Sequence, residues 1–301
     1  MGPGSVPHMF NRSSVMSRTV YVNGQYLPEE AAKVSVFDRG FLFADAVYEV
    51  TAVVNGRLAE YDGHMARLAR SCRELNLRLP VSIEALREIH LALIEKNQLQ
   101  EGGIYLQLSR GSTGDRDFAF PADAEPTLIL FTQARPVIHH PCAEKGIKVI
   151  TCPDLRWHRR DIKTVSLLMA CMAKEWAHEK GADDAWLVEN GLVTEGSSSN
   201  CYIVDANNHV ITRPLSNDIL HGITRAGLLK LAAQHNLVIE ERAFTPEEAR
   251  HAKEAFISSA TTFVWPVVEI DGVTIGDGRP GPLARQLREI YVGMVQAQTA
   301  G

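Results

Sequence analysis

The sequence predicts a two-domain protein of the α+β class. Its 301 residues are more than a single hydrophobic core comfortably organises. Strand-like runs that turn at Asn-Gly and Asp-Gly pairs occur in both halves of the chain, mixed with stretches whose apolar residues recur every three or four positions. Hairpins interspersed with amphipathic helices are typical of α+β proteins.

The first half is expected to form an N-terminal domain over 18–134. Its expected elements are, in order, a hairpin over 19–27, a hairpin over 46–61, helices over 62–77 and 83–97, and strands over 103–109 and 127–132. Asn-Gly pairs supply the positive φ angles that the two hairpin turns need. Asp62 is expected to cap the first helix, because a carboxylate can accept hydrogen bonds from the free amides of a first turn.

The stretch 135–141 is interpreted as a linker, followed by a C-terminal domain over 142–301. The expected elements are a strand over 148–151, a helix over 164–180, hairpins turning at 190–191 and 207–208, helices over 223–235 and from 245, a strand over 255–259, a hairpin over 267–275 and a helix over 282–296. Gly181 suits the left-handed position after a helix, and Thr245-Pro246-Glu247-Glu248 is a capping box.

Composition excludes several classes of function. The formal net charge of −5 disfavours a nucleic-acid-binding protein or a polybasic membrane protein, and the longest apolar runs are too short to span a bilayer. Five cysteines without CxxC or zinc spacing fit the reduced thiols of a cytoplasmic protein, and no metal site is expected. Residues 1–17 are interpreted as a tag or disordered leader.

Two short motifs carry the expected chemistry. Lys163 lies in Asp-Ile-Lys-Thr (161–164), and Glu195 lies in Thr-Glu-Gly-Ser-Ser-Ser-Asn (194–200). A lysine amine can form a Schiff base with an aldehyde, and a carboxylate can keep a pyridine nitrogen protonated. A protein must supply these two groups to use pyridoxal phosphate. Either residue alone is weak evidence, since most lysines and glutamates lie on the surface.

The two motifs and Leu-His-Gly-Ile-Thr-Arg (220–225) resemble, in order and spacing, the class IV, or fold-type IV, pyridoxal phosphate aminotransferases. Among these the chain is most similar to the D-amino acid aminotransferases, from about Tyr21 to about Tyr291. The resemblance implies a small N-terminal α/β domain, a larger C-terminal pseudo-barrel domain that binds pyridoxal 5′-phosphate, and a homodimer.

The resemblance also implies the cofactor contacts. Lys163 is expected to anchor the cofactor and to carry the proton, and Glu195 to face the pyridine nitrogen. The other expected contacts are Arg67, Ser198, Ser199, Asn200, Gly222, Ile223, Thr224 and Thr261. The Gly222 segment opens a helix, so its amides suit a phosphate. The pattern around Arg67 by itself predicts solvent exposure, and Arg67 is included because His64-x-x-Arg67-Leu68 matches the family.

The expected substrate contacts are Tyr48, Arg116 and Phe118. In the family, the arginine matched by Arg116 binds the substrate carboxylate, and its loop reaches the neighbouring subunit's site. Phe118 stands where the family has a histidine, which is expected to admit bulkier or less polar substrates. At two positions where the family has glycine, this chain has alanine: Ala44 and Ala46.

The resemblance implies transfer of the amino group of D-alanine to 2-oxoglutarate, giving pyruvate and D-glutamate by a ping-pong mechanism. The substrates are thus small amino acids and keto acids. Three activities of the same fold remain as alternatives: transamination of (R)-amines, transamination of branched-chain amino acids, and 4-amino-4-deoxychorismate lyase. The segment Val264-Trp265-Pro266 resembles sequence found in (R)-selective amine transaminases. A cofactor-binding protein without turnover is the most remote possibility.

Overall fold

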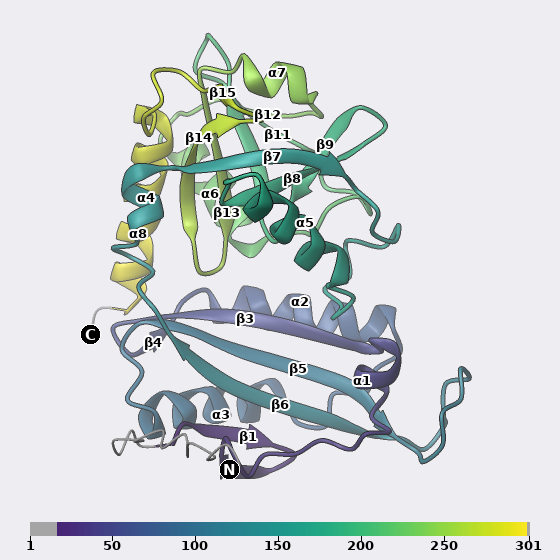
Figure 1. Cartoon of the computed structure of the whole chain (residues 1–301). Coiled ribbons are helices and arrows are strands. Elements are labelled where there is room, and N and C mark those ends of the chain that lie inside the picture. The colour runs from purple at the N-terminus through teal and green to yellow at the C-terminus, as the bar shows by residue number, and fades with distance from the viewer. Residues whose placement is uncertain (1–16, 300–301) are drawn as a thin grey trace, which may run out of the picture.

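Two β-sheets, each with its own helices, make up the chain (Figure 1). The computed structural model describes residues 17–299, so the expected leader lies outside the described residues except for its last member. Strands and helices are mixed in both parts, which confirms the predicted α+β class. No helix in the described part of the chain is long and apolar enough to cross a membrane.

The first sheet has six strands in the order β2-β1-β6-β5-β3-β4, and every neighbouring pair is antiparallel. The strands are β1 (Thr19–Val22), β2 (Gln25–Pro28), β3 (Ala46–Val54), β4 (Arg57–Leu58), β5 (Gly102–Ser112) and β6 (Glu125–Ala134). The helices are α1 (Arg39–Phe43), α2 (Tyr61–Glu74) and α3 (Ile83–Lys96). Both expected Asn-Gly hairpins are present, as β1–β2 and β3–β4.

Alternation along β3 gives this sheet two different faces. Val47 and Val53 point into a core shared with α2 and α3, whereas Ala52 and Val54 belong to a core shared with the C-terminal part. Tyr48 lies on the second face. The face that is not covered by its own helices is therefore available to form a site with the second sheet.

The prediction that Asp62 caps α2 is wrong. The helix begins at Tyr61, Glu60 occupies the capping position at φ 50°, and no side chain caps it. Asp62 lies in the first turn. The Glu60 carboxylate instead accepts a hydrogen bond from the Tyr291 hydroxyl of the last helix, which is a tertiary contact that a local pattern does not contain.

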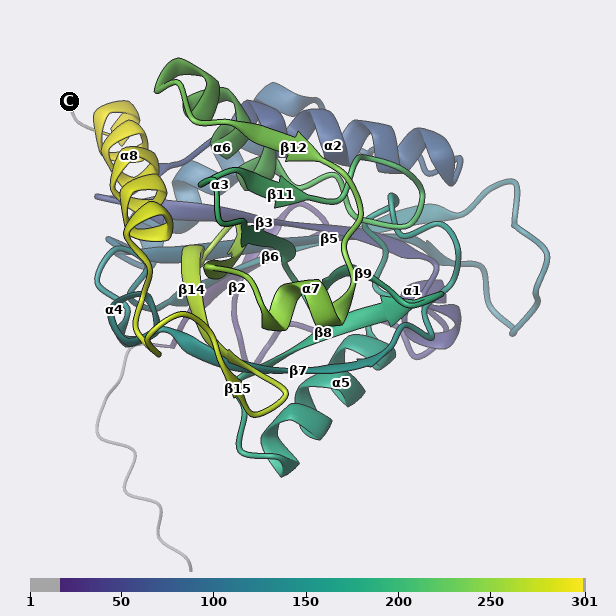
Figure 2. The same cartoon turned by 90° about the horizontal axis from the view of Figure 1, so that it is seen from above.

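The second sheet has nine strands in the order β12-β11-β10-β13-β14-β7-β8-β9, with β15 paired to β14. They are β7 (Ile147–Pro153), β8 (Asp184–Glu189), β9 (Leu192–Gly196), β10 (Asn200–Val204), β11 (Val210–Thr212), β12 (Ile239–Glu241), β13 (Glu254–Ser259), β14 (Phe263–Ile270) and β15 (Val273–Thr274). Because β9 at one end leads through a three-residue turn into β10 near the other, the sheet curls back on itself as a pseudo-barrel (Figure 2).

Five helices accompany this sheet: α4 (Pro141–Lys145), α5 (Leu168–Glu179), α6 (Ile223–Gln234), α7 (Pro246–Arg250) and α8 (Pro282–Thr299). Thr245 caps α7 as expected, accepting a hydrogen bond from the Glu248 amide at 3.0 Å. Gly181 adopts φ +70° after α5, also as expected.

Helix α5 begins at Leu168 and not at 164, so the expected start is wrong. The intervening residues bind the edge of the first sheet instead: the Tyr48 amide donates to the Lys163 carbonyl at 3.0 Å, and the Val165 amide donates to the Ala46 carbonyl at 3.2 Å. Backbone groups that pair with β3 cannot also form a helical turn.

The expected linker holds no strand, since β6 ends at Ala134, but its last residue, Pro141, is the first residue of α4. Its backbone is nevertheless clamped. The Glu101 carboxylate accepts from the amides of Val137 and Ile138, and the Arg288 guanidinium donates to the carbonyls of the same two residues. Arg288 also donates to the carbonyls of Thr262 and Val264, so one side chain joins α8, the linker and the β13–β14 turn.

Arg288→Met should therefore destabilise the fold by about 3 kcal/mol, because carbonyl groups would lose a charged donor. Urea unfolding measures this loss. Arg285→Met, an exposed arginine of the same helix, is the matched control and should stay within about 0.5 kcal/mol of the wild type. Equal stabilities of the two variants would contradict the clamp.

Candidate active site

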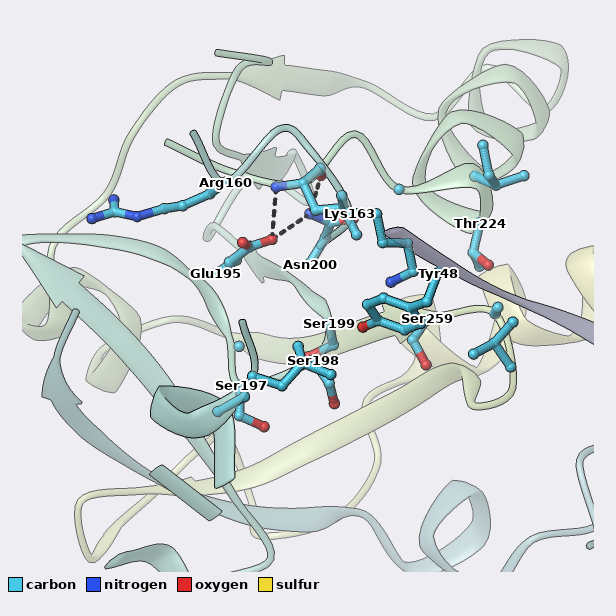
Figure 3. Close-up of a pocket in the computed structure, with 18 of the residues that line it drawn as sticks. Tyr48, Arg160, Lys163, Glu195, Ser197, Ser198, Ser199, Asn200, Thr224 and Ser259 are labelled. Carbon is cyan, nitrogen blue, oxygen red and sulfur yellow. Dashed lines mark hydrogen bonds between the residues drawn. The ribbon is translucent and has the colours of Figure 1, made fainter. Parts of the chain in front are cut away.

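A cavity of about 270 Å³ lies where the two sheets meet. Its walls come from β3, α2, the linker, the segment before α5, the β9–β10 turn, the start of α6 and the β13–β14 turn. The sequence-predicted residues that line it are Tyr48, Arg67, Lys163, Glu195, Ser198, Ser199, Asn200, Gly222, Ile223, Thr224 and Thr261. Residues from all over the chain thus converge on one cavity (Figure 3).

Lys163 stands on the irregular segment that is hydrogen-bonded to β3. Its Nζ lies 4.1 Å from the centroid of the Tyr48 ring. Figure 3 shows the amine beside that ring. The ring face stabilises a positive charge on that nitrogen, while the backbone bonds hold the stem. The amine is therefore presented to the cavity from a fixed position.

Glu195 is buried at the end of β9, and both of its carboxylate oxygens are engaged. Oε1 accepts from Arg156 at 2.5 Å, and Oε2 accepts from the Leu220 amide at 3.1 Å and from Asn200 Nδ2 at 3.3 Å. Burial raises the pKa of Glu195, and the Arg156 guanidinium opposes this shift. A cationic N–H bound to this carboxylate would favour its ionised form further.

A chain of ion pairs stands behind Glu195. Arg156 also binds Asp154 at 2.7 Å, and Arg160 joins Asp154 to Glu189. Burial alone would lower the pKa of Arg156, but its two carboxylate partners raise it. Sequence reasoning missed these residues. The signal that could have found them is the density of charged residues between 154 and 161, directly before Lys163.

Arg67 is buried, so the solvent exposure that its helical pattern predicts is wrong. Its Nε and Nη2 both donate to Glu49 at 2.7 Å, and Nη1 donates to the His221 carbonyl at 2.9 Å. Burial would raise the pKa of Glu49, but Arg67 and His64 together lower it to about 2. A buried arginine is tolerated here because a fully buried carboxylate on β3 compensates its charge.

Gly222 precedes the first turn of α6, where the helix amides are free. A Cβ atom at this position would lie 2.1 Å from Asn200 Oδ1, so only glycine allows this approach. Asn200 is held in turn by Glu195 and by the Leu220 carbonyl at 3.0 Å. The Asn200 side chain thus contacts both the Glu195 carboxylate and the segment that leads into α6.

The serines of the β9–β10 turn differ in their surroundings. Ser197 donates to Asp184 at 2.5 Å, and Ser198 is exposed to the cavity. Ser199 is buried, and its hydroxyl has no hydrogen-bond partner among residues 17–299. An unpartnered buried hydroxyl that lines a cavity is suited to a polar ligand.

Arg116 and Phe118 are not brought to the cavity of their own chain. They lie in the loop that projects from the first sheet between β5 and β6 (Figures 1 and 2). The Arg116 guanidinium lies over the rings of Phe43 and Phe118, at 5.0 and 4.8 Å from their centroids. Phe118 is 74% exposed. Within the described residues, this expected substrate contact is therefore remote from Lys163.

Comparison with known proteins places this cavity in a family. The model of the amino-transferase class IV family matches residues 46–270. The D-alanine aminotransferase of Staphylococcus aureus (strain MW2) is 38% identical over 283 residues, which cover 93% of this chain and 99% of that protein. The D-alanine aminotransferase of Bacillus licheniformis is 39% identical over 283 residues, covering 93% and 98% of the two chains.

Among solved structures, the chain is similar to the branched-chain amino acid aminotransferase of Thermobaculum terrenum in its PLP form, with a TM-score of 0.81. The two share 22% identity and cover 94% and 95% of each other, so this likeness concerns the fold. A lysine, a buried carboxylate and a helix start around one cavity fit pyridoxal 5′-phosphate. The chain therefore belongs to the class IV aminotransferases, and its cofactor is pyridoxal 5′-phosphate.

Proposed function

We propose that this aminotransferase acts on D-amino acids and transfers the amino group of D-alanine to 2-oxoglutarate, yielding pyruvate and D-glutamate. One observation carries the proposal: Lys163 and Glu195 line a single cavity in a chain that matches D-alanine aminotransferases over 98–99% of their length. Donor and acceptor use the same cavity in turn, which gives a ping-pong order.

Pyridoxal 5′-phosphate supplies, when bound, an aldehyde that condenses with amines and a ring that accepts an electron pair. The Lys163 amine would hold the cofactor, and its Nζ would carry the substrate proton. The Glu195 carboxylate would bind the ring N–H, and Arg156 opposes the rise in pKa that burial causes in that carboxylate. The amides of Ile223 and Thr224 at the start of α6 bind the phosphate.

Lys163→Ala should lower turnover of D-alanine by about 10²–10⁴-fold, the range typical of a lost general acid or base. Borohydride reduction of the wild type should fix the cofactor on the peptide that contains Lys163, and peptide mapping by mass spectrometry detects it. A variant that turns over at a near-normal rate would refute the assignment of Lys163.

Gly222→Ala should weaken pyridoxal 5′-phosphate binding at least about tenfold, because a Cβ 2.1 Å from Asn200 Oδ1 displaces the helix start or Asn200. Equilibrium dialysis of the apoenzyme measures the affinity. Gly293→Ala is the matched control, since nothing lies within 4 Å of its Cβ position on α8. The control should keep cofactor affinity and gain about 0.5–1 kcal/mol of stability. Unchanged affinity in Gly222→Ala would count against this phosphate site.

We further propose a homodimer in which Arg116 of one subunit binds the substrate carboxylate in the other's cavity. The exposed position of Arg116 and the apolar residues around it support this, since Phe41, Phe118 and Leu168 are each about three-quarters exposed on the single chain. Buried at an interface, such residues would stabilise association. Sedimentation velocity measures the oligomeric state, and a monomeric active enzyme would exclude a shared site.

Arg116→Ala should raise the Michaelis constant for D-alanine at least about tenfold, because a charge-assisted bidentate contact is lost. The Michaelis constant for (R)-1-phenylethylamine, which has no carboxylate, should change by less than about threefold. Steady-state kinetics on both donors decide the matter. Equal effects on the two donors would contradict a carboxylate contact.

The alternatives are separated by a donor panel of D-alanine, L-leucine and (R)-1-phenylethylamine, with pyruvate release in the absence of an acceptor indicating a lyase. The amine alternative loses its local support, because Trp265 packs on His140 with ring centroids 4.4 Å apart and does not line the cavity. All five cysteines are free, and this supports the proposal of a reducing, cytoplasmic location.

A further inference from the structure

The cavity is lined by four arginines: Arg67, Arg135, Arg156 and Arg160. Three of them are bound to buried or half-buried carboxylates. Arg135 forms no ion pair with any carboxylate of residues 17–299. It is the guanidinium in the cavity wall whose charge the described protein leaves uncompensated.

The contacts of Arg135 leave it ready to bind an anion. Its Nη2 donates to the Thr261 hydroxyl oxygen, so the hydroxyl proton of Thr261 stays free to be donated onward. Arg135 is an exposed residue at the edge of the cavity, yet partial burial lowers the pKa of its guanidinium. A bound anion would reverse that desolvation cost.

Arg135 is also held in place. Its amide donates to the Glu101 carbonyl at 3.3 Å, and the following linker residues are clamped by the Glu101 carboxylate and by Arg288. A guanidinium on a rigid backbone loses less conformational entropy when it binds a ligand. Such a constrained position favours a recognition role for this arginine.

The location of Arg135 relative to Lys163 sets the length of the ligand. Tyr48, which lies under Lys163, and Val50 are two residues apart on one face of β3, a step of about 6.6 Å. A Cβ at Gly103 would lie 3.4 Å from Val50 Cγ1 and 3.2 Å from Thr261 Cγ2, so Thr261 lies beside Val50. The Arg135–Thr261 pair is therefore about one strand step beyond the reacting centre.

We propose that Arg135 and Thr261 form a subsite for the distal carboxylate of a dicarboxylic substrate, such as 2-oxoglutarate or D-glutamate. The terminal carbons of a five-carbon diacid are about 5 Å apart when extended, given C–C bonds of about 1.5 Å. This span matches one strand step. The inference rests on the proposed function, because it places the α-carbon at Lys163.

The cofactor phosphate is the other anion in this cavity, and the geometry assigns it elsewhere. The phosphate end has the free amides of α6, and Arg67 is bound to the carbonyl of His221 directly before that helix. Arg135 instead enters from the linker, beside Val50 and Gln133 of the first sheet. Thr261, expected from the resemblance to touch the cofactor, is assigned to the substrate.

The test compares Arg135→Met and Arg135→Lys with the matched control Arg285→Met. Donor half-reactions are followed by the loss of the holoenzyme's visible absorption, with D-glutamate and with D-alanine. Arg135→Met should raise the half-saturating concentration of D-glutamate about 10–100-fold and that of D-alanine less than about threefold. Arg135→Lys keeps the charge and should lose less than the methionine variant, and Arg285→Met should match the wild type.

Calorimetric binding of glutarate and of butyrate to the holoenzyme gives a readout that needs no turnover. Arg135→Met should weaken glutarate binding about tenfold or more and leave butyrate unaffected. Equal losses for D-alanine and D-glutamate would assign Arg135 to the α-carboxylate, and a loss of pyridoxal 5′-phosphate affinity would assign it to the phosphate. Either result, or no effect at all, overturns the subsite.

The two proposals fail in different ways. A wild type that turns over no D-amino acid would defeat the proposed function, while the dependence of glutarate binding on Arg135 would still decide the subsite. A wild type that turns over D-alanine and D-glutamate, with an Arg135→Met variant of equal affinity for glutarate, would leave the proposed function intact and defeat the subsite alone.

Discussion

The site depends on two backbone hydrogen bonds between the Lys163 segment and β3, one from the Tyr48 amide and one to the Ala46 carbonyl. They join the two sheets at the position where the amine enters the cavity. Because the backbone of these residues pairs with β3, they cannot be helical, and α5 begins only at Leu168. The same contact sets the Tyr48 ring beside the Lys163 amine, so the proposed cofactor anchor and the aromatic wall are positioned together.

The polar groups of the cavity are of two kinds: those paired with an opposite charge of the protein, and those without such a partner in the described residues. The Glu49–Arg67 pair and the Asp154–Arg156–Glu195 chain are buried, and their charges are matched by close contacts. Breaking one partner of such a pair is strongly destabilising, so these networks act as fixed supports. Lys163, the Ser199 hydroxyl and Arg135 have no carboxylate partner in the part of the chain that the structure describes. These three groups are therefore available to bind ligands.

Local chemistry made much of the fold predictable from sequence. The Asn-Gly turns, the Thr245 cap and the Gly181 conformation depend only on residues at most four positions away. A short sequence pattern is therefore enough to predict them. Arg67 shows the limit: its helix position indicates exposure, and only the pairing with Glu49 across the fold buries it. The resemblance of the motifs predicted most of the residues that line the cavity. Arg135 and Arg156 were not predicted, because their contacts with Thr261 and Glu195 are tertiary and belong to no motif.

The side chain of Asn200 connects two parts of the cavity wall. It donates to the Glu195 carboxylate and to the Leu220 carbonyl, and its Oδ1 lies close to Gly222, so one side chain contacts both the acid and the segment that opens α6. The Leu220 amide donates a second hydrogen bond to the Glu195 carboxylate. In the proposed site this frame would fix the separation between the carboxylate that binds the ring nitrogen and the helix start that binds the phosphate, and it would select vitamin B6 derivatives by their length as well as by their reactive aldehyde.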